Sequence, residues 1–228
     1  MRGMTTNSGL KGEFDFNLRL IAGNVEIFDL GSGIRLEYQK GSNLGFIVSN
    51  VQYATKKSEQ FINRGFTHIR YNYSARRNAV WELYSQYEFN EFIKLFSRIL
   101  IGTGGRFALR DFERSTIILG TSYMLERENL DIKPGNDDKP LKWAHRWSNY
   151  VVVKFVSENR FSFLNTIYLQ PKIDKFDDIR ILNDMTIESD LTGRLKLTVS
   201  LHFRYDSFPP SGVKKTDFEL RNGFKVLF

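Results

Sequence analysis

The segment that most constrains the fold is the C-terminal one, residues 194–228, which reads RLKLTVSLHFRYDSFPPSGVKKTDFELRNGFKVLF. Apolar and polar residues alternate over residues 195–205, and after a break at residues 207–215 the alternation resumes over residues 218–228. Period-two alternation places the two sets of side chains on opposite faces of a strand. Each strand has about eleven residues, a length typical of tilted membrane-crossing strands and longer than the usual soluble strand. The segment therefore predicts two long strands, each with one apolar face and one charged face.

The same alternation recurs along the rest of the chain and predicts about twelve strands, which places the protein in the all-β class. Glycines in the sixth strand, Gly102, Gly104 and Gly105, predict a bend or bulge, because interior glycines often mark such irregularities in barrels. The first ten strands are expected near residues 10–20, 25–39, 44–53, 68–73, 81–88, 93–109, 117–125, 147–155, 161–169 and 179–187.

The connections between these strands alternate in length. Those after even-numbered strands are short, whereas the long ones, near residues 129–142 and 205–215, follow odd-numbered strands. Outer-membrane barrels have an even number of strands, short periplasmic turns and longer external loops. We therefore predict that the two long segments lie outside the cell and that Arg76 and Arg77 lie on the periplasmic side. Strands at regular spacing also fit a soluble barrel or sandwich, whose charged face would meet water.

Hydropathy alone describes this 228-residue chain as polar, with 26% charged residues and a mean hydropathy of -0.36. No apolar run reaches the roughly 18 to 20 residues of a membrane helix. A membrane barrel gives the same profile, because lipid-facing and lumen-facing residues alternate and cancel. The aromatic content of 14% fits a lipid face with interfacial girdles. We predict a transmembrane antiparallel up-and-down β-barrel: residues 9–228 form a single domain after an extended or disordered lead, residues 1–8. Its expected lipid-facing residues include Phe14, Phe16, Leu197, Leu201, Phe203 and Val226.

Composition also excludes several classes of site. The chain has no cysteine, which rules out disulfides and thiolate metal sites. The net charge is +7, but the basic residues are scattered along strands, so nucleic acid is not an expected partner. The N-terminal segment MRGMTTNSGLKGEF has no apolar core and is not a secretory signal. We expect that a signal was removed before this numbering or that the true start lies upstream.

The C-terminal break carries a motif that resembles a known family. Members of the domain-of-unknown-function family of salt-induced outer-membrane proteins end in a Pro-Pro-x-Gly-x-Lys-x-x-Asp loop before a final strand that closes on Phe. The matching residues here are Pro209, Pro210, Gly212, Lys214 and Asp217. Further matches are Gly23-Asn24, the segment around Trp81, RILIGTGGRFAL, and Asp178-x-Arg180.

The resemblance covers nearly the whole chain and implies a bacterial outer-membrane location and a link to salt stress, without an established activity. Members normally begin with a signal peptide. The final strand ending on Phe228, a common mark of outer-membrane barrels, indicates that the barrel-assembly machinery is a partner, together with outer-membrane lipids.

The charged faces of the strands predict the character of the lumen. One reading is a selective pore; the other is a plugged or very narrow lumen in which acids and bases pair, because an unpaired buried charge costs several kcal/mol. Near-balanced charge favours pairing, and Glu82 with Arg98 and Arg204 with Glu219 are candidate pairs between neighbouring strands. The charged residues expected to line the lumen are Glu13, Asp15, Arg19, Arg35, Glu37, Arg70, Glu82, Lys94, Arg98, Arg180, Asp184, Lys196, Arg204, Glu219 and Arg221.

Catalytic and metal sites have weak support. His68, His145 and His202 are far apart in sequence, and a zinc site needs three or four converging ligands. Ser200 and His202 share a strand face, but side chains at i and i+2 are too far apart for a direct hydrogen bond without special geometry. We therefore expect no catalytic residues, no metal and no cofactor.

Three functions remain open from the sequence. The first is a non-enzymatic outer-membrane barrel, narrow or plugged, that serves small-solute passage or the response of the envelope to osmotic stress. The second is a phospholipase-like barrel enzyme, which requires a polar cluster on the apolar outer face. The third is a soluble lipocalin-like barrel that binds a ligand and turns its apolar face inward.

Overall fold

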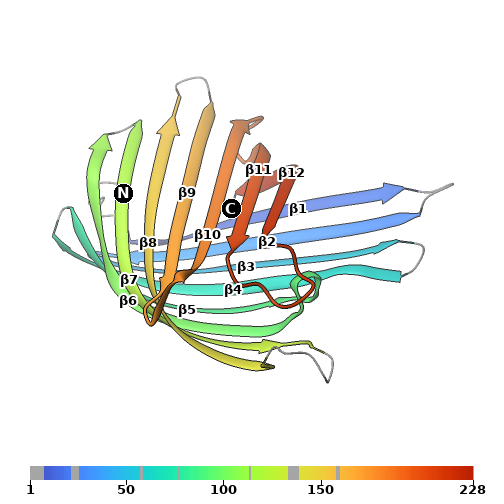
Figure 1. Ribbon diagram of the computed structural model, residues 1–228. Coiled ribbons are helices and arrows are strands. Elements are labelled where there is room, and N and C mark those ends of the chain that lie inside the picture. The colour runs from blue at the N-terminus through green and yellow to red at the C-terminus, as the bar shows by residue number, and fades with distance from the viewer. Residues whose placement is uncertain are drawn as a thin grey trace.

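Twelve antiparallel strands form a closed barrel, as predicted, in which each strand pairs with its sequence neighbours and β1 pairs with β12 (Figure 1). The structure is a computed structural model that describes residues 8–21, 26–56, 59–76, 78–112, 114–132, 139–157 and 160–227, apart from the side chains of 19, 21, 56, 59–61, 110 and 111. The strands are β1 Gly9–Ile21, β2 Ile27–Lys40, β3 Asn43–Lys56, β4 Glu59–Arg76, β5 Ala79–Asn90, β6 Leu95–Phe112, β7 Ser115–Leu130, β8 Leu141–Val156, β9 Phe161–Lys172, β10 Lys175–Asp190, β11 Leu195–Asp206 and β12 Thr216–Leu227.

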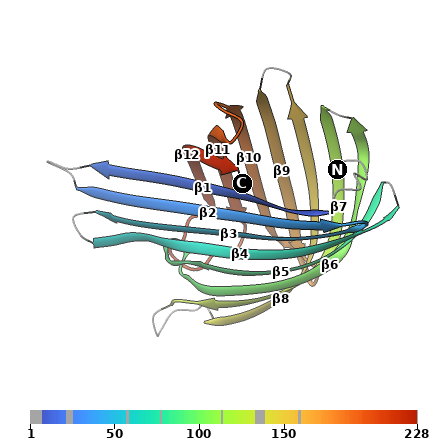
Figure 2. The same ribbon diagram turned by 180° about the vertical axis from the view of Figure 1, so that it is seen from behind.

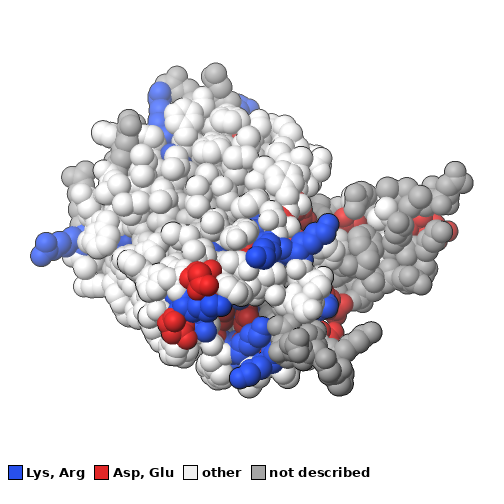
Figure 3. Space-filling view, viewed as in Figure 1, with Lys and Arg blue, Asp and Glu red and all other residues white. Residues whose placement is uncertain are grey.

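Alternation along the strands separates an apolar outer wall from a polar lumen. In β12, Phe218, Leu220 and Phe224 are exposed on the outside, whereas Glu219 and Arg221 are partly buried on the inside. Figure 3 shows the outer surface over β7–β10 with few charged atoms, while Lys, Arg, Asp and Glu gather near its lower edge. Among the described residues, no helix is long and apolar enough to cross a membrane.

Exposed Tyr and Trp side chains form a partial belt toward each end of the wall formed by β2–β8. At the end that holds the short turns, the belt contains Tyr38, Tyr71, Tyr73 and Trp81. At the other end it contains Tyr53, Tyr87 and Trp143, while Tyr123 and Trp147 lie opposite each other nearer the middle of β7 and β8. Such girdles mark the two membrane–water interfaces of outer-membrane barrels.

The long connections lie at one end, which we call the loop end; the opposite end is the turn end. The loop end holds residues 131–140 and 207–215, although the connections at 57–58 and 173–174 are as short as turns. The turn end holds the connections at residues 41–42, 77–78, 113–114, 157–160 and 191–194. Residues 1–7 of the predicted lead, Arg77, residues 133–138 and Phe228 lie outside the described residues.

Two details of the sixth strand differ from the sequence prediction. A 3-10 turn, η1 (Glu91–Ile93), followed by Lys94 with φ 57°, precedes β6, so the strand begins at Leu95. No bulge occurs at the glycines: β5 and β6 stay in register from Trp81–Gly105 to Tyr84–Gly102 and beyond. Gly102 serves instead to admit an aromatic ring, because a Cβ there would overlap the ring of Tyr84, whereas a Cβ at Gly104 would meet the backbone of Thr121 and Ser122.

Candidate functional site in the barrel lumen

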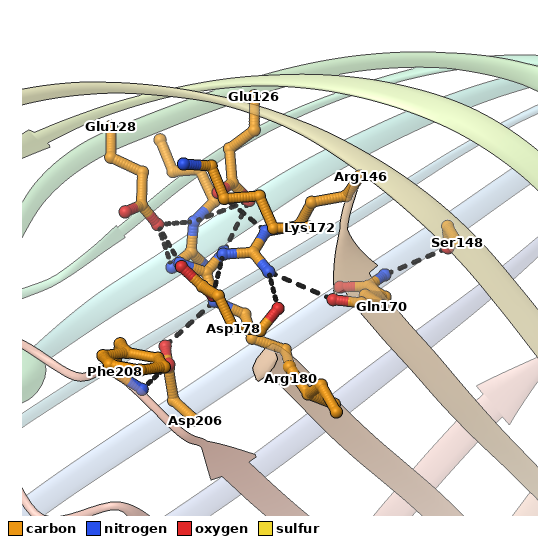
Figure 4. Close-up of polar contacts among 12 residues, drawn as sticks. Glu126, Glu128, Arg146, Ser148, Gln170, Lys172, Asp178, Arg180, Asp206 and Phe208 are labelled. Atoms are coloured by element: carbon orange, nitrogen blue, oxygen red, sulfur yellow. Dashed lines mark hydrogen bonds and ion pairs between the residues drawn. The ribbon is translucent and has the colours of Figure 1, made fainter. Parts of the chain in front are cut away.

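A buried group of arginines and carboxylates fills the lumen near the loop end. We call it the lumen cluster, and Figure 4 shows its members from β7, β8, β10 and β11 pointing toward one another. Each exposes less than a tenth of its surface, from 1% for Glu126 to 7% for Arg98 and Glu128. Its members are Arg98, Glu126, Glu128, Arg146, Arg180 and Asp206.

Arg180 is the centre of this cluster. Its Nη1 donates to Glu126 at 2.6 Å, its Nη2 to Glu128 at 2.7 Å and its Nε to Asp206 at 2.9 Å. The planar guanidinium presents five N–H donors in a fixed fork, which suits it to several carboxylates at once. Arg180 is on β10 and Glu126 is on β7, so the bridge spans the strands β8 and β9 across the inside of the barrel.

Two further arginines complete the cluster. Arg98 donates to Glu128 at 2.7 Å and to Glu88 at 2.9 Å. Arg146 donates to the Asp178 carboxylate at 2.9 Å and to the backbone oxygen of Gln170 at 3.0 Å. Every arginine of the cluster therefore has carboxylate partners, as a poorly solvated lumen requires.

Arg204 extends these contacts to the opposite wall. It lies on β11, 4.0 Å from Glu88 on β5 and 3.8 Å from Asp206. Strands β5 and β11 are on opposite sides of the ring, so charged side chains cross the full width of the lumen.

A second group of polar contacts surrounds the fully buried carboxylate of Glu82, closer to the turn end. Arg70 and Arg106 each approach it at 3.4 Å, and the hydroxyl of Tyr150 donates to it at 2.6 Å. Between Glu82 and the lumen cluster, Tyr84 packs with Leu100 and Met124. The lumen is thus filled by side chains along the wall formed by β5–β8.

The remaining lumen contains a cavity of about 750 Å³ beside the cluster. Its wall is mixed, with Phe46, Tyr84 and Tyr168 next to charged groups. Of the charged residues predicted to face the lumen, those that line this cavity are Arg35, Arg70, Arg98, Arg180, Asp184, Arg204, Glu219 and Arg221.

The other predicted lumen residues lie elsewhere. Near the turn end, Lys196 lies 2.9 Å from Asp190, and Glu13 lies 3.6 Å from Lys225, which is paired with Asp15 in the register. Glu37 accepts from Arg35 at 3.1 Å. The Arg19 side chain lies outside the described residues.

Lys94 and the two candidate ion pairs require correction. Lys94 lies outside the strands, where its Nζ donates to the backbone oxygen of Ser211 at 2.6 Å. In the observed registers Glu82 is opposite Gly104, and Arg204 is opposite Asp217. Glu82 therefore pairs with Arg70 and Arg106 rather than Arg98, and Glu219 with Arg64 and Arg221 rather than Arg204.

Several members of the cluster were absent from the sequence prediction. Glu126 and Glu128 continue the alternation of β7 beyond Leu125, and Arg146 alternates with Trp143 and Trp147 on β8. The periodic signal was therefore present, but the predicted strands ended too early near the long loop. The sequence predicts Asp206 in the long connection at residues 205–215, whereas it is the last residue of β11.

The Pro-Pro loop, residues 207–215, folds back on the loop end of the barrel (Figure 1). Gly212 has φ +79°, which favours glycine, and Val213 donates to the backbone oxygen of Pro210 at 2.9 Å. The Val213 side chain packs on a buried cluster of Ile93, Leu95 and Leu130. The remaining motif residues lie apart: Lys214 is exposed, and Asp217 lies at the start of β12 and lines the cavity.

The histidines and Ser200 have separate partners. His68 contacts Gln86 at 3.0 Å inside the barrel, and His145 contacts the Tyr123 hydroxyl on the outer wall. His202 lies 2.7 Å from Asp184, while Ser200 bonds to Thr186 at 3.1 Å. Within the described part of the chain, no group of three potential metal ligands occurs.

Comparison with known proteins supports the family resemblance and the fold. Residues 15–228 match the family described as "Protein of unknown function, DUF481", and no curated protein sequence matches the chain. The fold is similar to that of the NanC porin, with a TM-score of 0.55 and 10% identity over 96% of this chain and 99% of the porin.

Two other solved structures are less similar. The structure titled "Bacterial polysaccharide outer membrane secretin" has a TM-score of 0.49 and 7% identity over 98% of each chain. The translocator domain of the autotransporter NalP from Neisseria meningitidis has a TM-score of 0.48 and 10% identity, over 97% of this chain and 89% of that domain. The likeness to the porin shows a closed barrel of the outer-membrane type.

Proposed function

The chain belongs to the DUF481 family, and we propose that it is an integral protein of the bacterial outer membrane whose lumen is a restricted conduit for small solutes. The apolar outer wall and the exposed aromatic residues near its ends support the location, because outer-membrane barrels carry both features. Outer-membrane lipids and the barrel-assembly machinery, which reads the C-terminal strand, are its proposed partners. The proposed setting is envelope or osmotic stress.

The restriction of the lumen rests on one observation, the bridging of β10 to β7 by Arg180. Its three carboxylate partners lie on β7 and β11, so the guanidinium occupies space through which a solute would pass. Removing one partner of such a pair leaves uncompensated buried charge, which costs several kcal/mol and favours water entry. A charge-paired constriction admits small solutes slowly and excludes large ones.

Liposome swelling tests this function. We expect vesicles with the wild-type protein to swell slowly in a pentose and not in a tetrasaccharide. Arg180→Gln should increase the pentose rate severalfold, because Glu126, Glu128 and Asp206 lose their shared cation. Arg127→Gln, the same change on the outer wall beside Trp143, is the control and should leave the rate unchanged. Rapid swelling of wild-type vesicles in both sugars would overturn the proposal.

We further propose that the barrel acts without catalysis. The separate partners of Ser200 and His202 support this, because a nucleophile and its base need a mutual hydrogen bond. Both side chains lie on the lumen face rather than on the outer wall.

A further inference from the structure

The barrel closes through an unusually short seam. Strands β1 and β12 pair only from Glu13–Leu227 to Phe16–Phe224, whereas β1 pairs with β2 along its whole length, from Gly9 to Ile21. Beyond Phe16, β1 has no further paired β12 residue among the described residues, although β12 continues to pair with β11 as far as Thr216. The loop-side half of the seam is therefore unpaired.

Figures 1 and 2 show the geometry of this gap: the loop-side ends of β1–β4 project to one side, away from β11 and β12. The outward residues Leu18 and Leu220 beside it are 49% and 64% exposed, so the gap opens on the apolar wall. Unpaired strand edges are not tolerated in hydrocarbon unless they line protein or a water-filled cavity, because each free N–H or C=O costs several kcal/mol.

Side chains bridge the inside of the gap where the backbones do not pair. Arg64 on β4 donates through Nη2 to the Glu219 carboxylate on β12 at 2.5 Å, and Arg221 donates to the same carboxylate at 2.8 Å. Arg64 also donates to Gln52 on β3 at 2.9 Å, and Gln52 donates in turn to Asp29 on β2 at 3.1 Å. One carboxylate thus lies between two guanidinium groups directly behind the unpaired edges.

The 750 Å³ cavity reaches this bridge. Arg64, Glu219 and Arg221 all line it, and none of the described side chains of β1 does. A volume of this size is typical of small-molecule sites, which combine mostly apolar walls with a few placed polar groups. Apolar side chains on this part of the wall include Val48, Ile62, Phe66 and Phe92, and Phe218 on the outer face of β12 lies at its edge.

We propose that the gap between β1 and β12 is a lateral opening through which a single-chain amphiphile with an anionic headgroup enters the cavity from the outer leaflet. The headgroup replaces Glu219 on Arg64 and Arg221, and the chain lies along the apolar wall and out through the gap. A carboxylate or phosphate fits because guanidinium binds both bidentately. The proposed opening is in the barrel wall and does not involve the lumen cluster. This proposal depends on the membrane location proposed above.

A cysteine pair tests whether the gap persists in a bilayer, and the absence of native cysteine makes the assay clean. The register of Phe14 with Val226, continued, would place Leu18 opposite Asn222. Residues directly opposite in antiparallel strands are close enough for a disulfide. In nanodiscs, the Phe14→Cys/Val226→Cys control should oxidise and Leu18→Cys/Asn222→Cys should stay reduced. Intramolecular oxidation of the second pair would show a closed seam, and a disulfide-linked dimer would place a second copy in the gap; either result overturns the proposal.

Photolabelling tests the occupant. A diazirine-bearing dodecanoic acid in phosphatidylcholine nanodiscs should label peptides that contain Ile62, Phe66 or Phe92. Arg64→Gln/Arg221→Gln should reduce this labelling about tenfold, as expected for lost charge-assisted hydrogen bonds. Glu219→Gln should increase it, because both guanidinium groups lose their internal carboxylate.

Two controls make the labelling interpretable. Arg127→Gln should leave the labelling unchanged, and the corresponding diazirine alcohol should label the cavity weakly. Equal labelling by acid and alcohol, or labelling confined to outer-wall residues, would overturn the anionic site. Neither outcome changes the result expected in the swelling assay. Failure of the lateral opening is therefore distinguishable from failure of the restricted conduit.

Discussion

At the scale of single residues, glycine and tyrosine act together to fill the lumen. A Cβ at Gly102 would overlap the Tyr84 ring, and one at Gly120 would overlap the ring of Tyr150. Each pair is directly opposite in the register of neighbouring strands. The missing side chains let the rings lie flat against the backbone, where the Tyr84 hydroxyl bonds to Ser122 at 2.8 Å.

Gly102→Ala and Gly120→Ala should therefore each destabilise the barrel by about 1–3 kcal/mol, as overpacking of a filled interior does. Gly105→Ala is the matched control on β6, since a Cβ there meets only ordinary contacts, the nearest 3.7 Å away on Phe107. Reversible urea unfolding in lipid vesicles measures the free energy of unfolding. Equal effects of all three substitutions would contradict the role of the rings.

The outer wall gives a second prediction at this scale. Leu201 is opposite Leu220 on the outer face of β11, with exposed Val199 beside it. Leu201→Arg should cost about 2–4 kcal/mol near the bilayer midplane, as charged residues do on a barrel's lipid face. Leu201→Ala, which adds no charge, should cost less in the same vesicle unfolding assay. A neutral Leu201→Arg would place this residue away from lipid.

The alternation in sequence predicted which face each charged residue occupies, but not its partner. Glu82 and Arg98 both face inward, yet the register places Glu88 opposite Arg98. A shift of register by an even number of residues preserves every face and changes every pair. Arg180 also reaches carboxylates on β7, across two intervening strands, so sequence neighbours alone do not identify its partners.

At the scale of elements, the loop end is organised around the Pro-Pro loop. Lys94 donates to Ser211, and Ser207 donates through its hydroxyl to the backbone oxygen of Asp177 at 2.9 Å. The Nζ atom of Lys175 lies over the Phe208 ring, 3.4 Å from its centroid. The loop is thereby fastened to η1 and to the start of β10, on the edge of the lumen entrance.

This arrangement predicts opposite accessibility for the two ends in intact cells. An impermeant maleimide should label Lys214→Cys, on the loop end, but should label Arg76→Cys, on the turn end, only after the outer membrane is ruptured. Both side chains are exposed in the structure, so burial does not account for the difference. The reverse pattern would invert the orientation proposed for the barrel.

The sequence pattern predicts the number of strands and their order, but the strands that it predicts beside the long connection between β7 and β8 are too short. Strand β7 ends at Leu130 and β8 begins at Leu141, beyond the predicted ends, because backbone pairing continues to Asn129 and Leu141 although the apolar alternation weakens there. The same error hid Glu126, Glu128 and Arg146, which lie in these extensions or next to them. The unpaired seam was also invisible, since alternation describes each strand and not the closure of the ring.

At the scale of the whole molecule, the barrel divides into two regions. One side of the lumen is filled by the lumen cluster, Glu82 and the tyrosines, while the other contains the cavity that extends to β12. A barrel of twelve strands encloses more space than an eight-stranded barrel, whose interior side chains fill completely. It encloses less space than the sixteen-stranded barrels of open porins. In the proposed account, charge pairing across this intermediate lumen restricts the passage of solutes.

Single-channel recording in planar bilayers tests this account most directly. The purified wild-type protein, inserted from detergent in ordinary salt, should show little or no steady conductance, because Arg180 and its carboxylate partners span the lumen. Large and stable open currents, like those of general porins, would contradict the account and restore an open aqueous pore.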